Sequence, residues 1–152
     1  MILDRYPLES AHNIIGKVFV DRTAVVDPTS RIGPNVSIGP NCVIKSGVRI
    51  YNCILLDDVV VDSNTFLKDT IVCSNAVIGK WCRIEGKLHK DYFDYYRNAP
   101  SNYSHFSLDG KKHPDVTVVG SSVIVKDMVF IYNTVILPYK HIQSDCTSEI
   151  IM

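Results

Sequence analysis

Several features that mark other protein classes are missing from this sequence. No apolar run approaches the roughly 18 residues that a membrane-spanning helix needs. The start, MILDRYPLES, has an acid and a proline where a signal peptide has basic and then apolar residues. The 16 Lys and Arg balance the 16 Asp and Glu, so no charge excess points to nucleic acid or an anionic membrane. These absences predict a cytoplasmic protein that binds neither.

Cysteines and histidines are present, but not in the patterns of disulfides or metal sites. The five cysteines are an odd number and none forms CxxC, which favours reduced thiols. Cys42 and Cys82 fit buried apolar positions, and no pair of histidines has ligand spacing with a third partner. Because GxGxxG, GxxxxGK[ST] and GxSxG are also missing, we expect no catalytic residue, metal or cofactor in this chain. The histidines are His12, His89, His105, His113 and His141.

What the sequence does contain is a period of six. In RIGPNVSIGPNCVIKSGVRI, residues 31–50, isoleucine recurs every six residues, turn formers follow it, and a small or β-branched residue stands four positions on. Neither a helix nor a single strand has this period. Units of one short strand and one corner are typical of a hexapeptide-repeat solenoid, in which three units make one triangular coil. An ordinary β-sandwich would have this spacing only by accident.

Beyond Ile50 one step in three is shortened from six residues to five. The short steps fall at 51–55, 68–72 and 132–136. A deletion that returns once per three strands lies at the same corner of a triangular prism. The pattern predicts five complete coils and a partial sixth. The complete coils begin at Val20, Ile38, Leu55, Val72 and Val119, and the partial coil begins at Ile136.

A long insertion, 86–115, interrupts the pattern at this short corner, between Ile84 and Val119. It is rich in aromatic residues, which together with Arg are the usual anchors of protein interfaces. A loop of this length in a compact domain is uncommon and often functional. We therefore predict a partner-binding loop; the alternative is a loop that packs on its own solenoid. The candidate anchors are Tyr92, Phe93, Tyr95, Tyr96, Arg97 and Phe106.

The two ends of the solenoid need covers, because terminal coils expose strand edges. The segment PLESAHNII predicts a short capping helix, with Pro7 in its first turn and Gly16 at its stop. Residues 1–17 are thus read as linker and cap, and 18–152 as the β-helix domain. The tail ends in Ile150, Ile151 and Met152, which either fold back on the last coil or bind another chain.

The pieces GKWCRIEG, VILPYKHI and SEIIM, within the repeats, carry a resemblance to a known family. Almost the whole chain resembles the C-terminal domain of GDP-mannose pyrophosphorylase, also called mannose-1-phosphate guanylyltransferase. The long insertion ending in FSLDGKKHPDVTVVG resembles the alpha-type, regulatory subunit. The resemblance implies an all-β fold, a left-handed parallel β-helix. It also implies a parent enzyme that converts GTP and mannose-1-phosphate to GDP-mannose and pyrophosphate with Mg²⁺.

The family's nucleotidyltransferase domain has no counterpart in this sequence, so no catalytic residue is carried over. The resemblance therefore implies an excised C-terminal oligomerisation and regulatory domain that is inactive alone. Its partners would be further copies of itself, the catalytic beta-type subunit, or both. Two alternatives stay open. One is a stand-alone hexapeptide acyltransferase, which needs a histidine at a cleft between subunits that the regular coils lack. The other is a structural adaptor, which needs only a solenoid wall and a loop that can bind other proteins.

Overall fold

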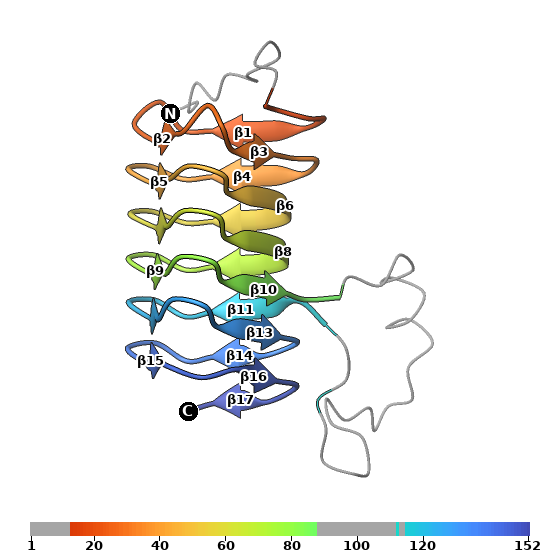
Figure 1. The fold of residues 1–152 in the computed structure, drawn as a ribbon, viewed down its shortest axis with the longest axis vertical. Coiled ribbons are helices and arrows are strands. Elements are labelled where there is room, and N and C mark those ends of the chain that lie inside the picture. The colour runs from red at the N-terminus through yellow and green to blue at the C-terminus, as the bar shows by residue number, and fades with distance from the viewer. Residues whose placement is uncertain (1–12, 88–111, 113–114) are drawn as a thin grey trace, which may run out of the picture.

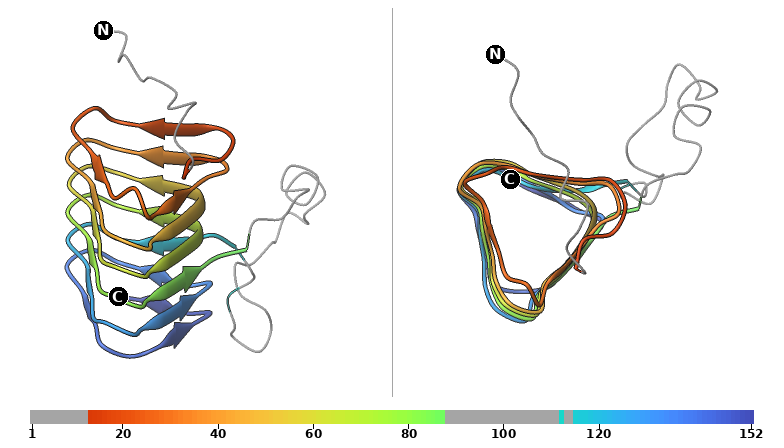
Figure 2. Two further views of the ribbon diagram at one scale, coloured as in Figure 1. Left: turned by 45° about the horizontal axis from the view of Figure 1, so that its top comes forward. Right: turned by 90° about the horizontal axis from the view of Figure 1, so that it is seen from above.

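The computed structural model describes residues 13–87, 112 and 115–152, which form a parallel β-solenoid of about six turns (Figure 1). Seen from above, the coils superimpose as a triangle with three walls (Figure 2). From the N-terminal end the strands run counterclockwise as the chain moves away from the viewer, so the coil is left-handed (Figure 2). All regular secondary structure of the described residues is β-strand. These residues contain no helix long and apolar enough to cross a membrane. The predicted fold class is confirmed.

Each wall is a stack of short parallel strands, one per coil. The first wall holds β1 (Val18–Val20), β4 (Val36–Ile38), β11 (Thr117–Val119), β14 (Val135–Ile136) and β17 (Ile150–Ile151). The second holds β2 (Val25–Val26), β5 (Val43–Ile44), β7 (Val60–Val61), β9 (Val77–Ile78), β12 (Ile124–Val125) and β15 (His141–Ile142). The third holds β3 (Arg31–Ile32), β10 (Arg83–Glu85), β13 (Phe130–Tyr132) and β16 (Cys146–Thr147). Two longer strands, β6 (Arg49–Leu55) and β8 (Phe66–Val72), belong to the third wall and then to the first.

The predicted short corner is the place where β6 and β8 bend from one wall to the next. Asn52 and Asp69 make the bend with single left-handed residues, at φ of 50° and 49°. Asn and Asp tolerate this conformation better than most residues do. One residue is enough to turn the chain here, which explains why the step loses a residue at this corner.

The insertion leaves the coil stack undisturbed. Ile84, before it, pairs with Leu67, and Val119, after it, pairs with Val72 on the same preceding coil. The coils on either side therefore stay in register, as predicted from the spacing.

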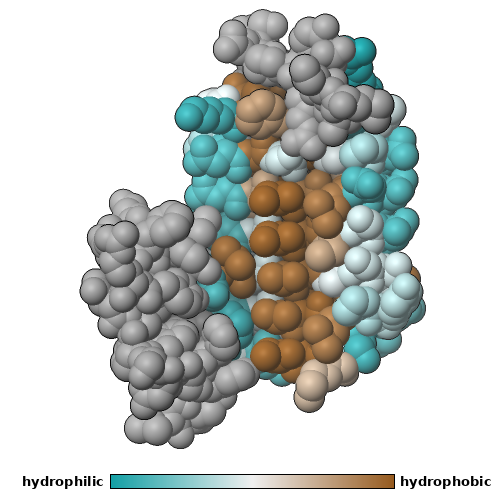
Figure 3. All heavy atoms as spheres, turned by 180° about the vertical axis from the view of Figure 1, so that it is seen from behind, coloured by the Kyte–Doolittle hydropathy of each residue, from teal (hydrophilic) through white to brown (hydrophobic). Residues whose placement is uncertain are grey.

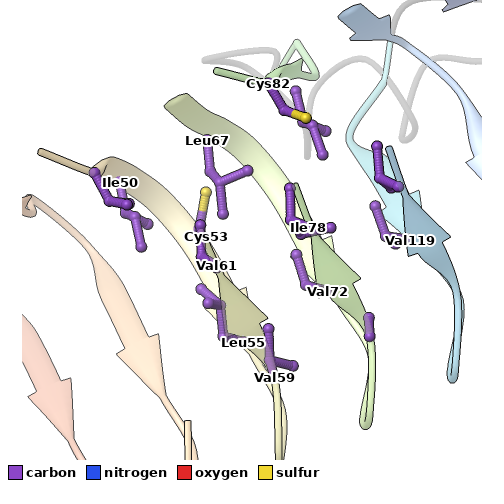
Figure 4. Packing of buried hydrophobic residues seen from close by; sticks show 14 of the residues in the cluster. Ile50, Cys53, Leu55, Val59, Val61, Leu67, Val72, Ile78, Cys82 and Val119 are labelled. Carbon is purple, nitrogen blue, oxygen red and sulfur yellow. The ribbon is translucent and has the colours of Figure 1, made fainter. Parts of the chain in front are cut away.

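The interior is one cluster of buried side chains from all three walls, and the large aliphatics at the six-residue positions fill most of it (Figure 4). Ile32, Ile50 and Leu67 have no exposed surface, and Ile44 has 1%. The second buried position of a unit often carries a hydroxyl or thiol, which donates to a backbone carbonyl of the next coil. Thr65 Oγ1 donates to Gly79 O at 2.7 Å, and Cys42 Sγ to Leu56 O at 2.8 Å. Buried polar atoms are thereby paired.

The two ends differ from expectation. Most of the predicted capping helix, residues 1–12, lies outside the described residues, but its last part, 13–17, is not helical. Ile15 N donates to Ile32 O at 2.8 Å, and Ile32 N donates to Asn13 O at 2.9 Å. This segment pairs with the first coil because the coil edge offers it unpaired backbone groups. At the other end the tail continues the spiral, since β17 pairs with β14.

Candidate interaction surfaces

The base of the insertion is closed by backbone hydrogen bonds. Lys87 N donates to Asp115 O at 2.8 Å, and Thr117 Oγ1 donates to Glu85 O at 2.6 Å. Gly86 stands at the exit point, where an added Cβ would lie 2.2 Å from Asp69 O and 2.5 Å from Thr117 N. No other residue fits between these backbones, so the sequence RIEG ends in glycine for a steric reason.

Asn133 binds Lys112 and Asp115, where the insertion returns to the solenoid. Its side chain is 1% exposed. Oδ1 accepts from Lys112 Nζ at 2.9 Å and from Asp115 N at 3.0 Å, while Nδ2 donates to Lys112 O at 3.0 Å. At equivalent corners of earlier coils, Asn35, Asn52 and Asp69 instead bind one another at 3.0–3.1 Å. The short corner thus becomes an anchor for the insertion at Asn133.

The predicted anchor residues of the insertion itself lie outside the described residues: Tyr92, Phe93, Tyr95, Tyr96, Arg97 and Phe106. Their role stays a prediction. The tail residues are described. Ile150 and Ile151 form β17, Ile150 is 39% exposed, and Met152 is 84% exposed. The tail therefore lies on a wall of the solenoid with apolar side chains on the outside.

The outer side of the first wall is apolar over most of its length, and we call it the aliphatic face. Strand register aligns seven outward residues as the rungs of a ladder, one per coil. From first to last they are Phe19, Ser37, Ile54, Ile71, Val118, Val135 and Ile150. Leu56, Cys73 and Leu137, each one residue past a buried position, lie beside the ladder. Figure 3 shows this face as a brown column between more hydrophilic borders.

The second wall carries a comparable ladder, which we call the valine face. Its rungs are Val25, Val43, Val60, Val77, Ile124 and His141. Charged residues lie directly beside these rungs, including Lys45 and Asp62, whose side chains form an ion pair at 3.0 Å. Asp27 and Lys126 occupy equivalent places on other coils. The valine face is therefore apolar only along one narrow line.

The third wall is cationic and aromatic. Its rungs are Arg31, Arg49, Phe66, Arg83, Phe130 and Asp145. The guanidinium carbons of Arg49 and Arg83 lie 5.4 and 5.2 Å from the ring centroid of Phe66, within cation–π range. Arg83 also pairs with Glu85 at 2.8 Å.

Two large side chains project from the corner between the second and third walls. Trp81 and Met128 are 65% and 76% exposed and have φ of 57° and 60°, in the left-handed region. Earlier coils have Gly47 and Asn64 at this corner, also with positive φ. A bulky residue in this conformation is uncommon, and tryptophan is enriched among interface anchors. Trp81 was not among the residues predicted from the sequence to bind a partner. The available signal was that the single tryptophan of the chain stands at a corner position.

The cysteine thiols are unpaired, as the odd number suggested. Cys42 and Cys82 are buried at the predicted positions. Burial raises the pKa of the Cys53 thiol to about 12 and also raises the pKa of Cys73. Thiolate is the reactive form, so these cysteines are poor nucleophiles. Cys73, half-buried beside the aliphatic face, is the most accessible of the five.

In the described part of the chain no three His, Cys, Asp or Glu residues lie close enough to hold a metal ion, so these residues do not fit Mg²⁺. Of the histidines only His141 is described, and it is exposed on β15. It lines an open hollow of about 280 Å³ with Lys126 and Gln143. The other four histidines lie outside the described residues.

Comparison with known families decides what kind of solenoid this is. A family model described as the GMPPB C-terminal domain matches residues 14–152. The chain belongs to this family. The match spans the repeats, the insertion and the tail, and the family resemblance of the sequence is confirmed.

Relatives of this C-terminal domain are mannose-1-phosphate guanylyltransferases. A probable enzyme of this name from Schizosaccharomyces pombe is 35% identical over 140 residues, which cover 91% of this chain and 32% of that protein. A regulatory subunit alpha from Dictyostelium discoideum is 34% identical over 145 residues, covering 95% and 32%. Mannose-1-phosphate guanylyltransferase 1 of Arabidopsis thaliana is 30% identical over 146 residues, with the same coverage. The chain thus spans about a third of the length of these relatives.

Solved structures give a more distant likeness. The acetyltransferase domain of PglB from Neisseria gonorrhoeae aligns over 86% of this chain and 51% of that chain, with 13% identity and a TM-score of 0.42. A likeness this low does not bear on activity.

Proposed function

We propose that this chain is the oligomerisation and regulatory domain of a mannose-1-phosphate guanylyltransferase assembly. The observation that carries the proposal is the family match over residues 14–152, combined with relatives of which this domain is only a third. In the proposed assembly, GTP and mannose-1-phosphate react at a nucleotidyltransferase domain outside this chain, and Mg²⁺ belongs to that domain. The unpaired thiols favour a reducing compartment, so the proposed location is the cytoplasm.

The proposed contact with a catalytic subunit uses the insertion and the corner at the opposite edge of the third wall. The base of the insertion is fixed by Asn133 and Gly86, so the solenoid presents this loop from a defined point. Trp81 offers a second, described anchor, because its side chain is largely exposed on a rigid corner. Presenting a loop from a stiff solenoid is a common way to place a regulatory contact.

The experiment first incubates the chain alone with GTP, mannose-1-phosphate and Mg²⁺ and measures pyrophosphate release. We expect none. Pyrophosphate release that depends on this chain alone would contradict the proposal.

The second part measures binding of the chain to a catalytic guanylyltransferase subunit, and the rate of GDP-mannose formation by that subunit. We expect the chain to bind and to change the rate. Deleting 86–115, which restores a five-residue step from Ile84 to Val119 like the one at 51–55, should abolish the rate effect while leaving thermal unfolding cooperative, since loop length costs little entropy. Trp81→Ala should weaken binding, whereas Tyr139→Ala serves as the control, because Tyr139 is also a left-handed corner residue and is 79% exposed. Absence of binding by the intact chain would refute the regulatory role.

A further inference from the structure

The aliphatic face is unusual for a protein surface because it is continuous. From Ile54 to Ile150 its five rungs are all Ile or Val. The neighbouring column contains Leu56, Cys73, Gly120, Leu137 and Met152, so neither column carries a charge over these five coils. Ile54, Leu56 and Leu137 are each 40–46% exposed. Extended apolar patches of this kind mark interaction sites.

The valine face shows that a ladder of aliphatic rungs is not by itself enough. Val77 and Ile124 are 40% and 43% exposed, close to the 46% and 39% of Ile54 and Ile150 on the aliphatic face. The central rungs of the aliphatic face, Ile71, Val118 and Val135, are half-buried. Covering them, however, would also cover Lys45, Asp62 and Lys126 in the adjacent column, and removing charges from water is costly. From Ile54 to Ile150 the aliphatic face can be covered without that cost, and only Asp21 in the first coil carries a charge in the adjacent column, so this wall is better suited to burial.

The shape of the face limits what can cover it. Seven rungs on parallel strands about 4.8 Å apart make a straight, flat strip, roughly 29 Å long. A partner must offer an uncharged, flat, aliphatic strip of similar length, and a second copy of this chain offers one. Two β-sheet faces pack about 10 Å apart with nearly aligned strands, and a twofold axis makes such contact self-complementary.

We propose that the aliphatic face pairs with the same face of a second copy of this chain, with Ile71 at the twofold axis. Ile71 is the fourth of seven rungs, so it meets its own copy whether the two solenoids run parallel or antiparallel. The proposal specifies the oligomerisation part of the proposed function and rests on it; binding of a catalytic subunit at the insertion is separate.

The buried area sets the expected strength. A strip two columns wide covers on the order of 400 Å² per copy, about half of what each partner buries in a standard specific interface and typical of a weak, transient contact. The chain should therefore dimerise weakly, with dissociation in the micromolar range, and its dimer should be sensitive to one central substitution. A hollow of about 250 Å³ between Phe19 and Ile54, over the small Ser37, leaves the first coils less well packed than the centre.

The test is sedimentation equilibrium of the chain over a micromolar concentration range, with charge exchange at Ile71. The unaltered chain should be in monomer–dimer equilibrium. Ile71→Lys and Ile71→Glu should each weaken dimerisation at least tenfold, because like charges meet at the axis. An equal mixture of the two variants should associate at least tenfold more tightly than either alone, because opposite charges then meet.

The matched control is Val77→Lys, a substitution of an aliphatic rung on the valine face, which should leave dimerisation unchanged. Leu56→Lys tests the same face at an exposed edge if either Ile71 variant unfolds. An unaltered chain that stays monomeric, equal weakening by Val77→Lys, or a mixture no tighter than the single variants would each overturn the proposal. Binding of Ile71→Lys to the catalytic subunit is measured separately. Because that contact is proposed at the insertion, loss of self-association with unchanged subunit binding separates the dimer proposal from the regulatory role.

Discussion

The aliphatic face and the valine face are built from the same repeat, yet the columns of residues beside their rungs differ in charge. Each has one outward aliphatic rung per coil, placed by the alternation of side chains along a short strand. On the valine face the next outward position holds residues such as Lys45 and Asp62; on the aliphatic face it holds Leu56, Cys73 and Leu137. The comparison teaches that an exposed rung becomes a docking surface only through its neighbouring column.

The comparison assumes strict alternation between interior and surface, and adjacent residues of β5 test that assumption. Ile44 is 1% exposed inside the coil, so Ile44→Ala should cost about 2–5 kcal/mol of unfolding free energy. Val43, its neighbour, points outward on the valine face, and Val43→Ala should cost less than about 1 kcal/mol. Urea unfolding measures both. Similar losses at the two positions would mean that the assigned register is wrong.

Asn133, at the border of the aliphatic face, should make a contribution of intermediate size to the free energy of unfolding. Asn133→Ala removes hydrogen bonds to Lys112 and Asp115 and leaves the half-buried Lys112 without the donor to its carbonyl. We expect a loss of about 1–3 kcal/mol, together with faster amide exchange at Lys87 and Asp115. Asn52→Ala, at the same corner of a coil without the insertion, should leave exchange at these two amides unchanged. Equal effects on exchange would argue against a specific clamp at Asn133.

The smallest expected effect concerns the charges beside the valine face. Lys45 and Asp62 form a solvated pair with side-chain exposures of 46% and 20%. Such pairs contribute about 0–1 kcal/mol, so Lys45→Ala should barely change the urea midpoint. It should also leave the chain no more associated than before, because Asp27, Asp62 and Lys126 remain. Tighter self-association of this variant would show that the Lys45 charge alone prevents two valine faces from pairing.

The interior of this fold could be predicted from sequence because its rule is periodic. A buried aliphatic every six residues and a deletion every third unit together gave the coil count, the triangular section and the position of the insertion. The N-terminal helix was wrong in its described part, 13–17, because helix signals in a short segment competed with an open strand edge. Pairing with the unpaired backbone groups of the adjacent coil outweighs the helix propensity of so short a segment.

The surfaces were harder to predict. The aliphatic face had a signal, since the residue before the buried position is apolar at Ile54, Ile71, Val118 and Val135. Its meaning depends on the register of strands that are far apart in sequence, including two on either side of the insertion. Asn133 carried no signal at all: it occupies the same corner as Asn52, and its partners Lys112 and Asp115 come from another part of the chain.

The central claim is that the aliphatic face, and not the valine face, is covered when two copies meet. Native Cys73 lies beside Ile71 on the aliphatic face and is the most accessible thiol of the chain, and Val77→Cys places a reporter on the valine face. Alkylation of both thiols should be followed at a fixed, mildly alkaline pH as protein concentration is raised through the micromolar range. The account predicts that alkylation of Cys73 slows while that of the residue 77 thiol stays constant. Constant rates at both thiols, or equal slowing at both, would contradict it.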